Sequence, residues 1–186
     1  MEYDEESISQ LLKSLRFSAD KHRNQRRKDE QASPYINHPI EVVDTLWRVG
    51  QVRQMPTLVA AVLHDTIEDT SATPDEIRRM FGDEVLELVL EVTDDKSLPD
   101  KTRKQLQIEH APFISDAAKQ IKLADKICNV YDLSHSPPKD WSQQRLKEYM
   151  DWTEKVVAGL QGANLALEAL YYEVLRNAKN LLAKQD

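Results

Sequence analysis

The sequence has little glycine and only one cysteine. Four of its 186 residues are glycine, and Cys128 is the single cysteine. One cysteine excludes an internal disulfide and fits a reducing compartment, so we expect a cytoplasmic protein. Scarce glycine, together with long stretches rich in Ala, Leu, Glu, Lys and Gln, favours helices over sheets.

Long hydrophobic runs and a positive net charge are also absent. The run from Leu58 to Leu63 is far too short to cross a membrane. Residues 1–6 are acidic and have no apolar centre, so no signal peptide is expected. The net charge of −7 argues against a general nucleic-acid binder. We therefore expect neither a membrane nor a nucleic acid as partner, although residues 21–28 form a local basic cluster.

The apolar residues recur with a period near 3.6, and no segment alternates strictly. This pattern predicts an all-α fold, and the length fits a single domain over residues 1–186. Thr73 and Glu76 form a capping box around Pro74, a strong signal for a helix start. A short β-hairpin within residues 24–37 stays open. The expected helices cover about 9–23, 39–50, 56–69, 74–82, 83–92, 101–110, 115–133, 142–160 and 164–184.

The segment from His64 to Asp69 carries the first chemical signal. An apolar run continues directly into His64, Asp65, Glu68 and Asp69. On one helix, His64 would neighbour Glu68 and Asp65 would neighbour Asp69, at i, i+4. Carboxylates so close repel one another and are costly to bury, so a bound cation is the simplest compensation. The plainer interpretation is a helix end that emerges into solvent.

Two other segments weaken that plainer interpretation. His38 lies where a loop meets a helix start, and Asp125 lies on a polar stripe with Lys122, Asn129 and Asp132 at 3-4-3 spacing. Alone, His38 would be read as a cap or core residue and the stripe as a solvated helix face. Together with His64 and Asp65, these segments supply two imidazoles and two carboxylates. Such a set suits Mn, Fe, Zn or Co, with a water on the ion as nucleophile.

The ordered pattern His38, His64-Asp65 and Asp125 resembles the signature of the HD superfamily. The surrounding residues from about 17 to 170 resemble the hydrolase half of RelA/SpoT proteins, and most of all the small stand-alone alarmone hydrolases of the metazoan SpoT-homologue type. The motifs are Arg26-Arg27-Lys28-Asp29, Pro34-Tyr35-Ile36-Asn37-His38-Pro39, His64-Asp65-Thr66-Ile67-Glu68-Asp69-Thr70, Phe81-Gly82, Val92-Thr93-Asp94-Asp95-Lys96, Lys122-Leu123-Ala124-Asp125-Lys126, and Trp141-Ser142 with Tyr149 and Trp152.

The resemblance implies an HD-domain bundle of about ten helices with one Mn²⁺ at His38, His64, Asp65 and Asp125. It implies hydrolysis of the 3′-diphosphate of guanosine tetra- or pentaphosphate (ppGpp or pppGpp) to GDP or GTP and pyrophosphate. Glu68 and Asp69 match the family's catalytic acids, with the roles of acid and base open between them. The residues that match substrate-binding positions are Arg27, Lys28, Asn129, Arg145 and Tyr149. One departure is Asp100 after Pro99, where relatives can have Lys; its charge could weaken phosphate binding at that rim.

Other functions compete with this one. A phosphatase for another nucleotide with a 2′- or 3′-phosphate, such as NADPH, could use the same metal site. A cyclic-nucleotide phosphodiesterase would leave Arg27-Lys28 and Glu68-Asp69 without a use. An inactive nucleotide sensor is disfavoured by the intact acid pair, and a structural helical module by the acid cluster itself. The oligomeric state stays open, because Trp47, Trp141 and Trp152 suit either a core or an interface.

Overall fold

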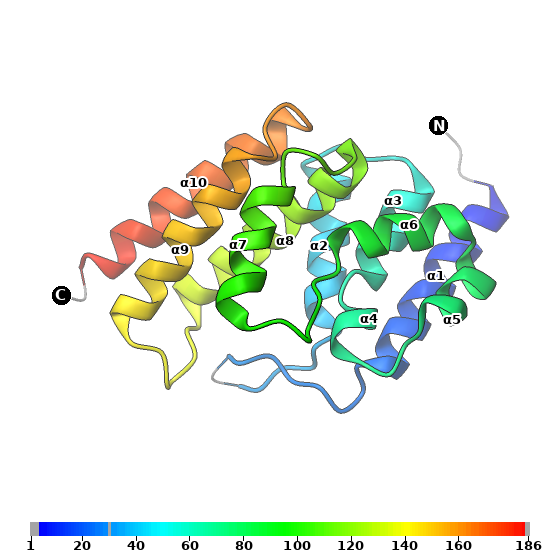
Figure 1. Ribbon diagram of the computed structural model, residues 1–186, viewed down its shortest axis with the longest axis horizontal. Coiled ribbons are helices and arrows are strands. Elements are labelled where there is room, and N and C mark those ends of the chain that lie inside the picture. The colour runs from blue at the N-terminus through cyan, green and yellow to red at the C-terminus, as the bar shows by residue number, and fades with distance from the viewer. Residues whose placement is uncertain (1–3, 30, 185–186) are drawn as a thin grey trace.

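The computed structural model describes residues 4–29 and 31–184. Parts of the acidic N-terminus 1–6, of the possible hairpin in 24–37 and of the expected domain 1–186 therefore lie outside the described residues. The predicted all-α fold is confirmed: the described residues form ten helices and one isolated β-bridge. Figure 1 shows their arrangement. The helices are α1 (Glu5–Lys21), α2 (Asn37–Arg48), α3 (Met55–Leu63), α4 (Thr66–Asp69), α5 (Pro74–Phe81), α6 (Asp83–Val92), α7 (Asp100–His110), α8 (Asp116–His135), α9 (Gln143–Ala158) and α10 (Leu165–Leu182).

Polar N-caps fix where several helices begin. The predicted capping box of α5 is present: Thr73 Oγ1 accepts from the Glu76 N–H, and the Glu76 carboxylate accepts from the Thr73 N–H. Ser115, Ser142 and Asn164 cap α8, α9 and α10 in the same way with their side-chain oxygens. Each such cap contributes about 1 kcal/mol. These three longer helices therefore start close to the residues that the sequence indicated.

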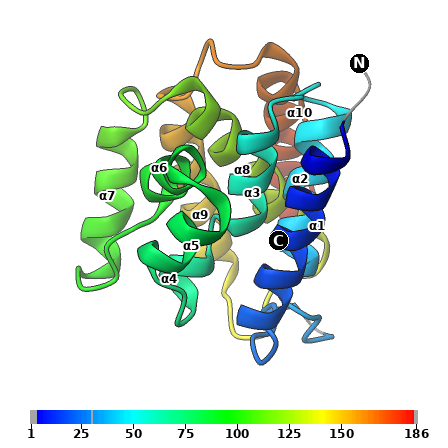
Figure 2. The ribbon, with the colours of Figure 1, turned by 90° about the vertical axis from the view of Figure 1, so that its right-hand side faces the viewer.

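Helix α3 occupies the centre of the bundle. Every residue from Thr57 to Leu63 is buried, and α3 packs against α1, α2, α6 and α8. Figures 1 and 2 show α3 enclosed by these neighbours, with α8 continuing toward α9 and α10. Truncating a core side chain such as Leu63 to Ala would cost roughly 2–5 kcal/mol. The position of the C-terminal end of α3 is consequently fixed by the core.

Helix α1 places two serines more deeply in the core than its leucines. Leu12 and Ala19 are exposed, whereas Ser14 and Ser18 are fully buried. Small serines allow α1 to approach α3 closely, and the Ser14 hydroxyl donates to its own helix at the Leu11 carbonyl, 2.8 Å away. Small side chains at these two positions therefore permit close packing against α3.

The loop between α1 and α2 folds back on itself. The hairpin left open by the sequence amounts to one bridge between Arg26 and Pro34, with the Arg27 N–H donating to the Ser33 carbonyl at 2.8 Å. Proline cannot donate a ladder hydrogen bond, and Ala32 has a left-handed φ of 50°, so the pairing stops there. This fold sets Arg27 and Tyr35 beside the ends of α3 and α8.

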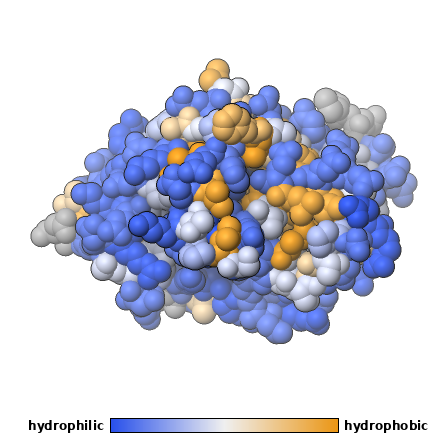
Figure 3. Space-filling model, in the orientation of Figure 1, coloured by the Kyte–Doolittle hydropathy of each residue, from blue (hydrophilic) through white to orange (hydrophobic). Residues whose placement is uncertain are grey.

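The surface seen in Figure 3 is mostly hydrophilic, with hydrophobic side chains in small patches between charged ones. In the part of the chain that the structure describes, no helix has both the length and the apolar character needed to cross a bilayer.

Candidate active site

The chain bends at His64 and Asp65. The sequence predicted one helix through His64–Asp69, and this was wrong: α3 ends at Leu63, and the separate short helix α4 begins at Thr66. The His64 ring and the Thr66 hydroxyl donate to the Ala61 and Leu63 carbonyls at 2.8 and 2.7 Å, which satisfies the last carbonyls of α3. Asp65 takes the bridge conformation, φ −99° and ψ −2°, in which many active-site residues are found.

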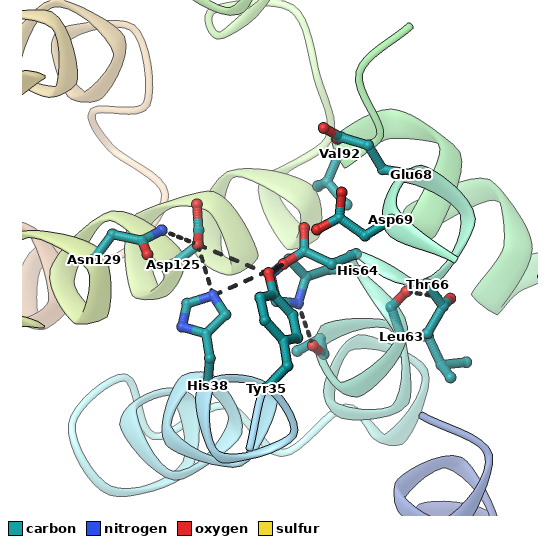
Figure 4. A network of polar contacts seen from close by, with 12 residues as sticks. Tyr35, His38, Leu63, His64, Thr66, Glu68, Asp69, Val92, Asp125 and Asn129 are labelled. Carbon is teal, nitrogen blue, oxygen red and sulfur yellow. Dashed lines mark hydrogen bonds and ion pairs between the residues drawn. The ribbon is translucent and has the colours of Figure 1, made fainter. Parts of the chain in front are cut away.

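The structure brings the four predicted metal ligands together. His64 Nε2 lies 3.0 Å from Asp65 Oδ2 and 3.9 Å from Asp125 Oδ1, and His38 Nε2 lies 3.1 Å from Asp125 Oδ1 and 4.0 Å from Asp65 Oδ2. One nitrogen or oxygen from each of His38, His64 and Asp65 lies within 4.8 Å of the others, as a metal ion requires. Figure 4 shows these side chains converging from α2, the end of α3 and α8.

The orientation of His64 fits a cation. Its Nδ1 donates to the Ala61 carbonyl, so Nε2 is left to point its lone pair at the two carboxylates. Nε2 is buried and makes no hydrogen bond, although Asp65 is near it. The C-terminal end of α3 adds partial negative charge at the same place. An imidazole nitrogen without a hydrogen bond that faces two largely buried carboxylates suits a divalent metal ion.

The charges in this cluster are strongly coupled. Burial would lower the pKa of His64, but the carboxylates of Asp65 and Asp125 outweigh burial and raise that pKa to about 9. Burial would raise the pKa of Asp65, yet the imidazoles of His64 and His38 hold it well below its ordinary value. The pKa of His38 is lowered, chiefly by burial. Without a metal ion, a proton on His64 therefore supplies the positive charge that balances the two carboxylates.

Three further side chains hold the carboxylates of the cluster in place. The Tyr35 hydroxyl donates to Asp65 Oδ2. The Lys126 ammonium donates to Asp125 Oδ2 at 2.9 Å, and the Asn129 amide to Asp125 Oδ1 at 2.5 Å. Sequence reasoning assigned no site role to Tyr35 or Lys126, although both stand inside the motifs. The role of Lys126, one residue after Asp125, could not be predicted because its burial depends on packing under Trp152. The Trp152 ring lies 4.8 Å from the ammonium.

The acid pair Glu68 and Asp69 sits on α4, beside the cluster but apart from its ligand atoms (Figure 4). Glu68 accepts from the Asp94 N–H at 3.1 Å and faces the Arg103 guanidinium at 3.5 Å. Burial and the neighbouring acids Asp94, Asp65 and Asp69 raise the pKa of Glu68 to about 7. It can therefore exchange a proton near neutral pH.

Asp69 is held differently. Its Oδ2 accepts from the Gln25 amide at 2.9 Å, and its Oδ1 from the Lys96 ammonium. Gln25 is fixed in turn by His22 Nδ1, 2.7 Å away. These partners fix Asp69 at the point where two cavities meet. No sequence pattern indicates Gln25, because only the folded loop brings it to α4.

Three residues of the cluster, His64, Asp65 and Asp125, line a chamber of about 330 Å³, which adjoins a groove of about 410 Å³. Both cavities are lined by Lys28, Tyr35, Asp69, Asn129 and Tyr149. Among the predicted substrate-binding residues, Lys28, Asn129 and Tyr149 therefore stand at the junction, and Arg27 and Arg145 line only the groove.

The two arginines of the groove differ in their ion pairs. Arg27 is an ion-pair partner of Asp132 and donates to Asn129 at 3.3 Å, so it is largely committed to α8. Arg145 is exposed, with its guanidinium stacked 4.2 Å from the centre of the Trp141 ring. Asp100 lies at the rim, as the sequence departure suggested, and pairs with Lys104 at 3.2 Å. This carboxylate reduces the positive field of the groove.

The polar stripe on α8 does not face water. Lys122 and Lys126 are buried, and Asp125 and Asn129 line the chamber with them. The alternative of an ordinary solvated helix face was therefore wrong for this part of α8, because α6, α3 and α9 pack around it.

The fold and this cluster define a class of protein. A family model described as HD domain matches residues 14–160, and the chain belongs to this family. Among curated relatives, the guanosine-3′,5′-bis(diphosphate) 3′-pyrophosphohydrolase MESH1 of Homo sapiens is 51% identical over 160 residues, 86% of this chain and 89% of the relative. MESH1 of Drosophila melanogaster is 45% identical over 168 residues, 90% of this chain and 94% of the relative.

A solved structure is similar over nearly the whole chain. It is described as a metazoan ortholog of SpoT that hydrolyzes ppGpp and plays a role in starvation responses. It has a TM-score of 0.90 and 44% identity, and the match covers 95% of this chain and 98% of that one. The resemblance to stand-alone alarmone hydrolases that the sequence indicated is confirmed.

Proposed function

We propose that this protein removes the 3′-diphosphate from guanosine 3′,5′-bis(diphosphate), giving GDP and pyrophosphate, and likewise converts the pentaphosphate to GTP. The observation that carries this proposal is the chamber itself. The cluster of His38, His64, Asp65 and Asp125 lies beside a protonatable Glu68, at the inner end of a groove with aromatic and cationic walls. The named activity of relatives about half identical supports the same substrate.

We propose one Mn²⁺ as the resident metal, held by the four residues of the cluster. Two imidazoles and two carboxylates also suit Zn, Fe or Co, so the donor set favours a borderline divalent ion over Ca or Mg. When bound, such an ion lowers the pKa of a water molecule and stabilises charge on a phosphoryl oxygen. Tyr35, Lys126 and Asn129 would keep the two carboxylates in position for it.

Each acid of the pair carries out one proton transfer. Water attacks the phosphorus attached to the ribose O3′, the P–O3′ bond breaks, and O3′ must gain a proton. Glu68 donates that proton, because its raised pKa keeps it partly protonated at neutral pH and a bound polyanion raises that pKa further. Asp69 orients the water and accepts its proton, since Gln25 and Lys96 hold both of its oxygens. One water is consumed, and one nucleoside hydroxyl and one pyrophosphate are formed.

The groove binds the nucleotide. Lys28 stands at the junction and would neutralise phosphate oxygens there, while Asn129 would reach the ribose or its phosphate. Arg145 on Trp141, with Tyr149 beside that ring, forms a planar wall that suits the far end of the nucleotide. Arg27 shapes the floor of the groove through Asp132 and Asn129. The basic cluster thus acts locally in a protein of net charge −7.

The test is a turnover assay on metal-free protein to which Mn²⁺ is returned. GDP and pyrophosphate should form in equal amounts from the tetraphosphate, and only when metal is present. A panel of other nucleotides with 2′- or 3′-phosphates, NADPH among them, should react more slowly. A protein with a filled metal site that leaves the tetraphosphate intact would refute the substrate assignment while leaving the metal site in place.

The proposal also covers the domain organisation and the cellular location. We infer that residues 1–186 act as one hydrolase domain and that the protein works in the cytoplasm. Size-exclusion chromatography with activity measured across the peak, and localisation of a tagged copy in cells, test these two points.

A further inference from the structure

Lys122 is the least compensated buried charge beside the active site. Its side chain is only 8% exposed, yet within the described residues no carboxylate oxygen lies within 4.0 Å of its ammonium. Among the described residues its only hydrogen bond is a long one, 3.3 Å, to the Val92 carbonyl. An ammonium has three donors, so two are left without a protein acceptor. A buried cation in this condition is costly unless a ligand completes its surroundings.

Lys126, one turn further along α8, shows the contrast. Lys126 is equally buried, but it has a carboxylate partner in Asp125 at 2.9 Å and an aromatic face in Trp152. Burial lowers the pKa of Lys122, whereas for Lys126 the attraction of Asp125 overcomes burial and raises the pKa. Lys126 therefore supports the metal cluster through Asp125, whereas no charge within the described residues pairs with Lys122.

The position of Lys122 in the chamber indicates which group it could bind. Five residues line both the chamber and the groove, and they mark where a nucleotide passes from one into the other. Nine residues line the chamber but not the groove, and Lys122 and Lys126 are the two lysines among them. Lys126 already pairs with Asp125. A nucleotide that enters from the groove and places its first 3′-phosphorus at the cluster would carry its terminal phosphate further into the chamber, where Lys122 is the lysine available to it.

We propose that Lys122 is the binding residue for the terminal phosphate of the 3′-diphosphate, and thereby favours a diphosphate over a monophosphate substrate. This inference rests on the proposed function for the orientation of the nucleotide. The ammonium supplies charge-assisted hydrogen bonds to an anion that a monoester lacks. After cleavage, the same residue holds one end of pyrophosphate, so it also governs product affinity.

The decisive variant is Lys122→Met, which keeps the volume and removes the charge. Its kcat/KM for guanosine 3′,5′-bis(diphosphate) should fall roughly 10- to 100-fold, the effect of losing a hydrogen bond to a charged group. Its kcat/KM for the matched nucleotide with a single 3′-phosphate should change little. Lys119→Met is the control, because Lys119 is on the same helix but lines neither the chamber nor the groove. It should leave both substrates unchanged.

Product inhibition gives an independent measurement. At a fixed free Mn²⁺ concentration, the inhibition constant of pyrophosphate should rise in Lys122→Met by a similar factor, and that of orthophosphate should not. Metal content should stay at the wild-type value. The melting temperature should not fall, because replacing an unpaired buried charge by an apolar side chain removes its desolvation cost.

Two results would overturn the proposal. One is an equal loss on the diphosphate and monophosphate substrates, which is expected if Lys122 only balances the charges of Glu68, Asp94 and Asp125. The other is unchanged pyrophosphate inhibition. If wild type does not hydrolyse the tetraphosphate, the proposed function fails, and calorimetric titration of pyrophosphate into the metal-loaded protein still decides this point. Weaker binding in Lys122→Met supports the subsite, and equal binding refutes it.

Discussion

The metal cluster and the groove in front of it are built in different ways. The proposed ligand residues of the cluster are buried or nearly so and stand on α2, at the end of α3 and on α8, which the core holds in place. The groove residues Lys28 and Arg145 stand on a loop and on an exposed helix face. Rigid packing thus sets the chemistry, whereas adaptable side chains set recognition. Changes in the first region should abolish turnover, and changes in the second should shift affinity.

The largest effect is expected inside the cluster. His64→Ala removes the nitrogen that faces both carboxylates, so bound metal and turnover should fall to background while the helices stay folded. Elemental analysis of purified protein and the ppGpp assay measure the two losses. His135→Ala, an exposed histidine at the end of α8, is the control. Full metal content in His64→Ala would remove His64 from the ligand set.

The next effect separates chemistry from metal binding. Asp69→Asn keeps the shape of a side chain that touches no ligand atom of the cluster, so metal should stay bound while kcat falls roughly 100- to 10,000-fold. Single-turnover kinetics with metal-loaded protein would measure this loss. Asp75→Asn, on the exposed first turn of α5, should leave kcat unchanged. Wild-type kcat in Asp69→Asn would end its catalytic role.

Glu68 links activity to pH. As a proton donor with a pKa raised to about 7, it should make kcat fall as the pH rises through that value. Glu68→Gln should lower kcat and remove this descending limb, and Glu84→Gln, an exposed acid on α6, should keep it. A limb that survives in Glu68→Gln would assign the titration to another group.

The same raised pKa has a consequence for stability. A carboxyl group that holds its proton more tightly when folded stabilises the protein at low pH and loses this effect as it ionises. The free energy of unfolding of the metal-free protein should therefore decrease between pH 4.5, the ordinary pKa, and about 7. Urea titrations at several pH values should show a weaker decrease in Glu68→Gln.

The smallest effect belongs to the rim of the groove. Asp100→Asn would remove the carboxylate that pairs with Lys104 and Arg103 and make the groove more positive. Exposed pairs contribute only about 0.2–1 kcal/mol, so KM for the tetraphosphate should fall by no more than roughly fivefold, with kcat unchanged. A higher KM in Asp100→Asn would show that Asp100 assists binding.

The contrast between the regions also explains what the sequence could predict. Residue types that need compensation indicated a cation site, and the resemblance to the HD signature selected its four residues; His38, His64, Asp65 and Asp125 do converge. Roles that depend on tertiary contacts were missed. Gln25 reaches Asp69 across 44 residues, and Lys122 and Lys126 differ only in which neighbours surround them. The bend at His64–Asp65 was missed too, since nothing local breaks the helix there.

Because of the bend at His64–Asp65, the rotation of α3 about its axis determines where these two side chains point. The helix is buried on every side, so its rotation about its own axis is set by packing, and the two ligands are the first residues beyond it. Each residue of a helix turns the chain by about 100°. Lengthening α3 by a single residue would thus have two incompatible solutions: keep the core and swing both ligands away, or keep the ligands and unpack the core. Side chains along α3 can therefore be exchanged one at a time, whereas an insertion or deletion within it should cost either the core or the proposed metal site.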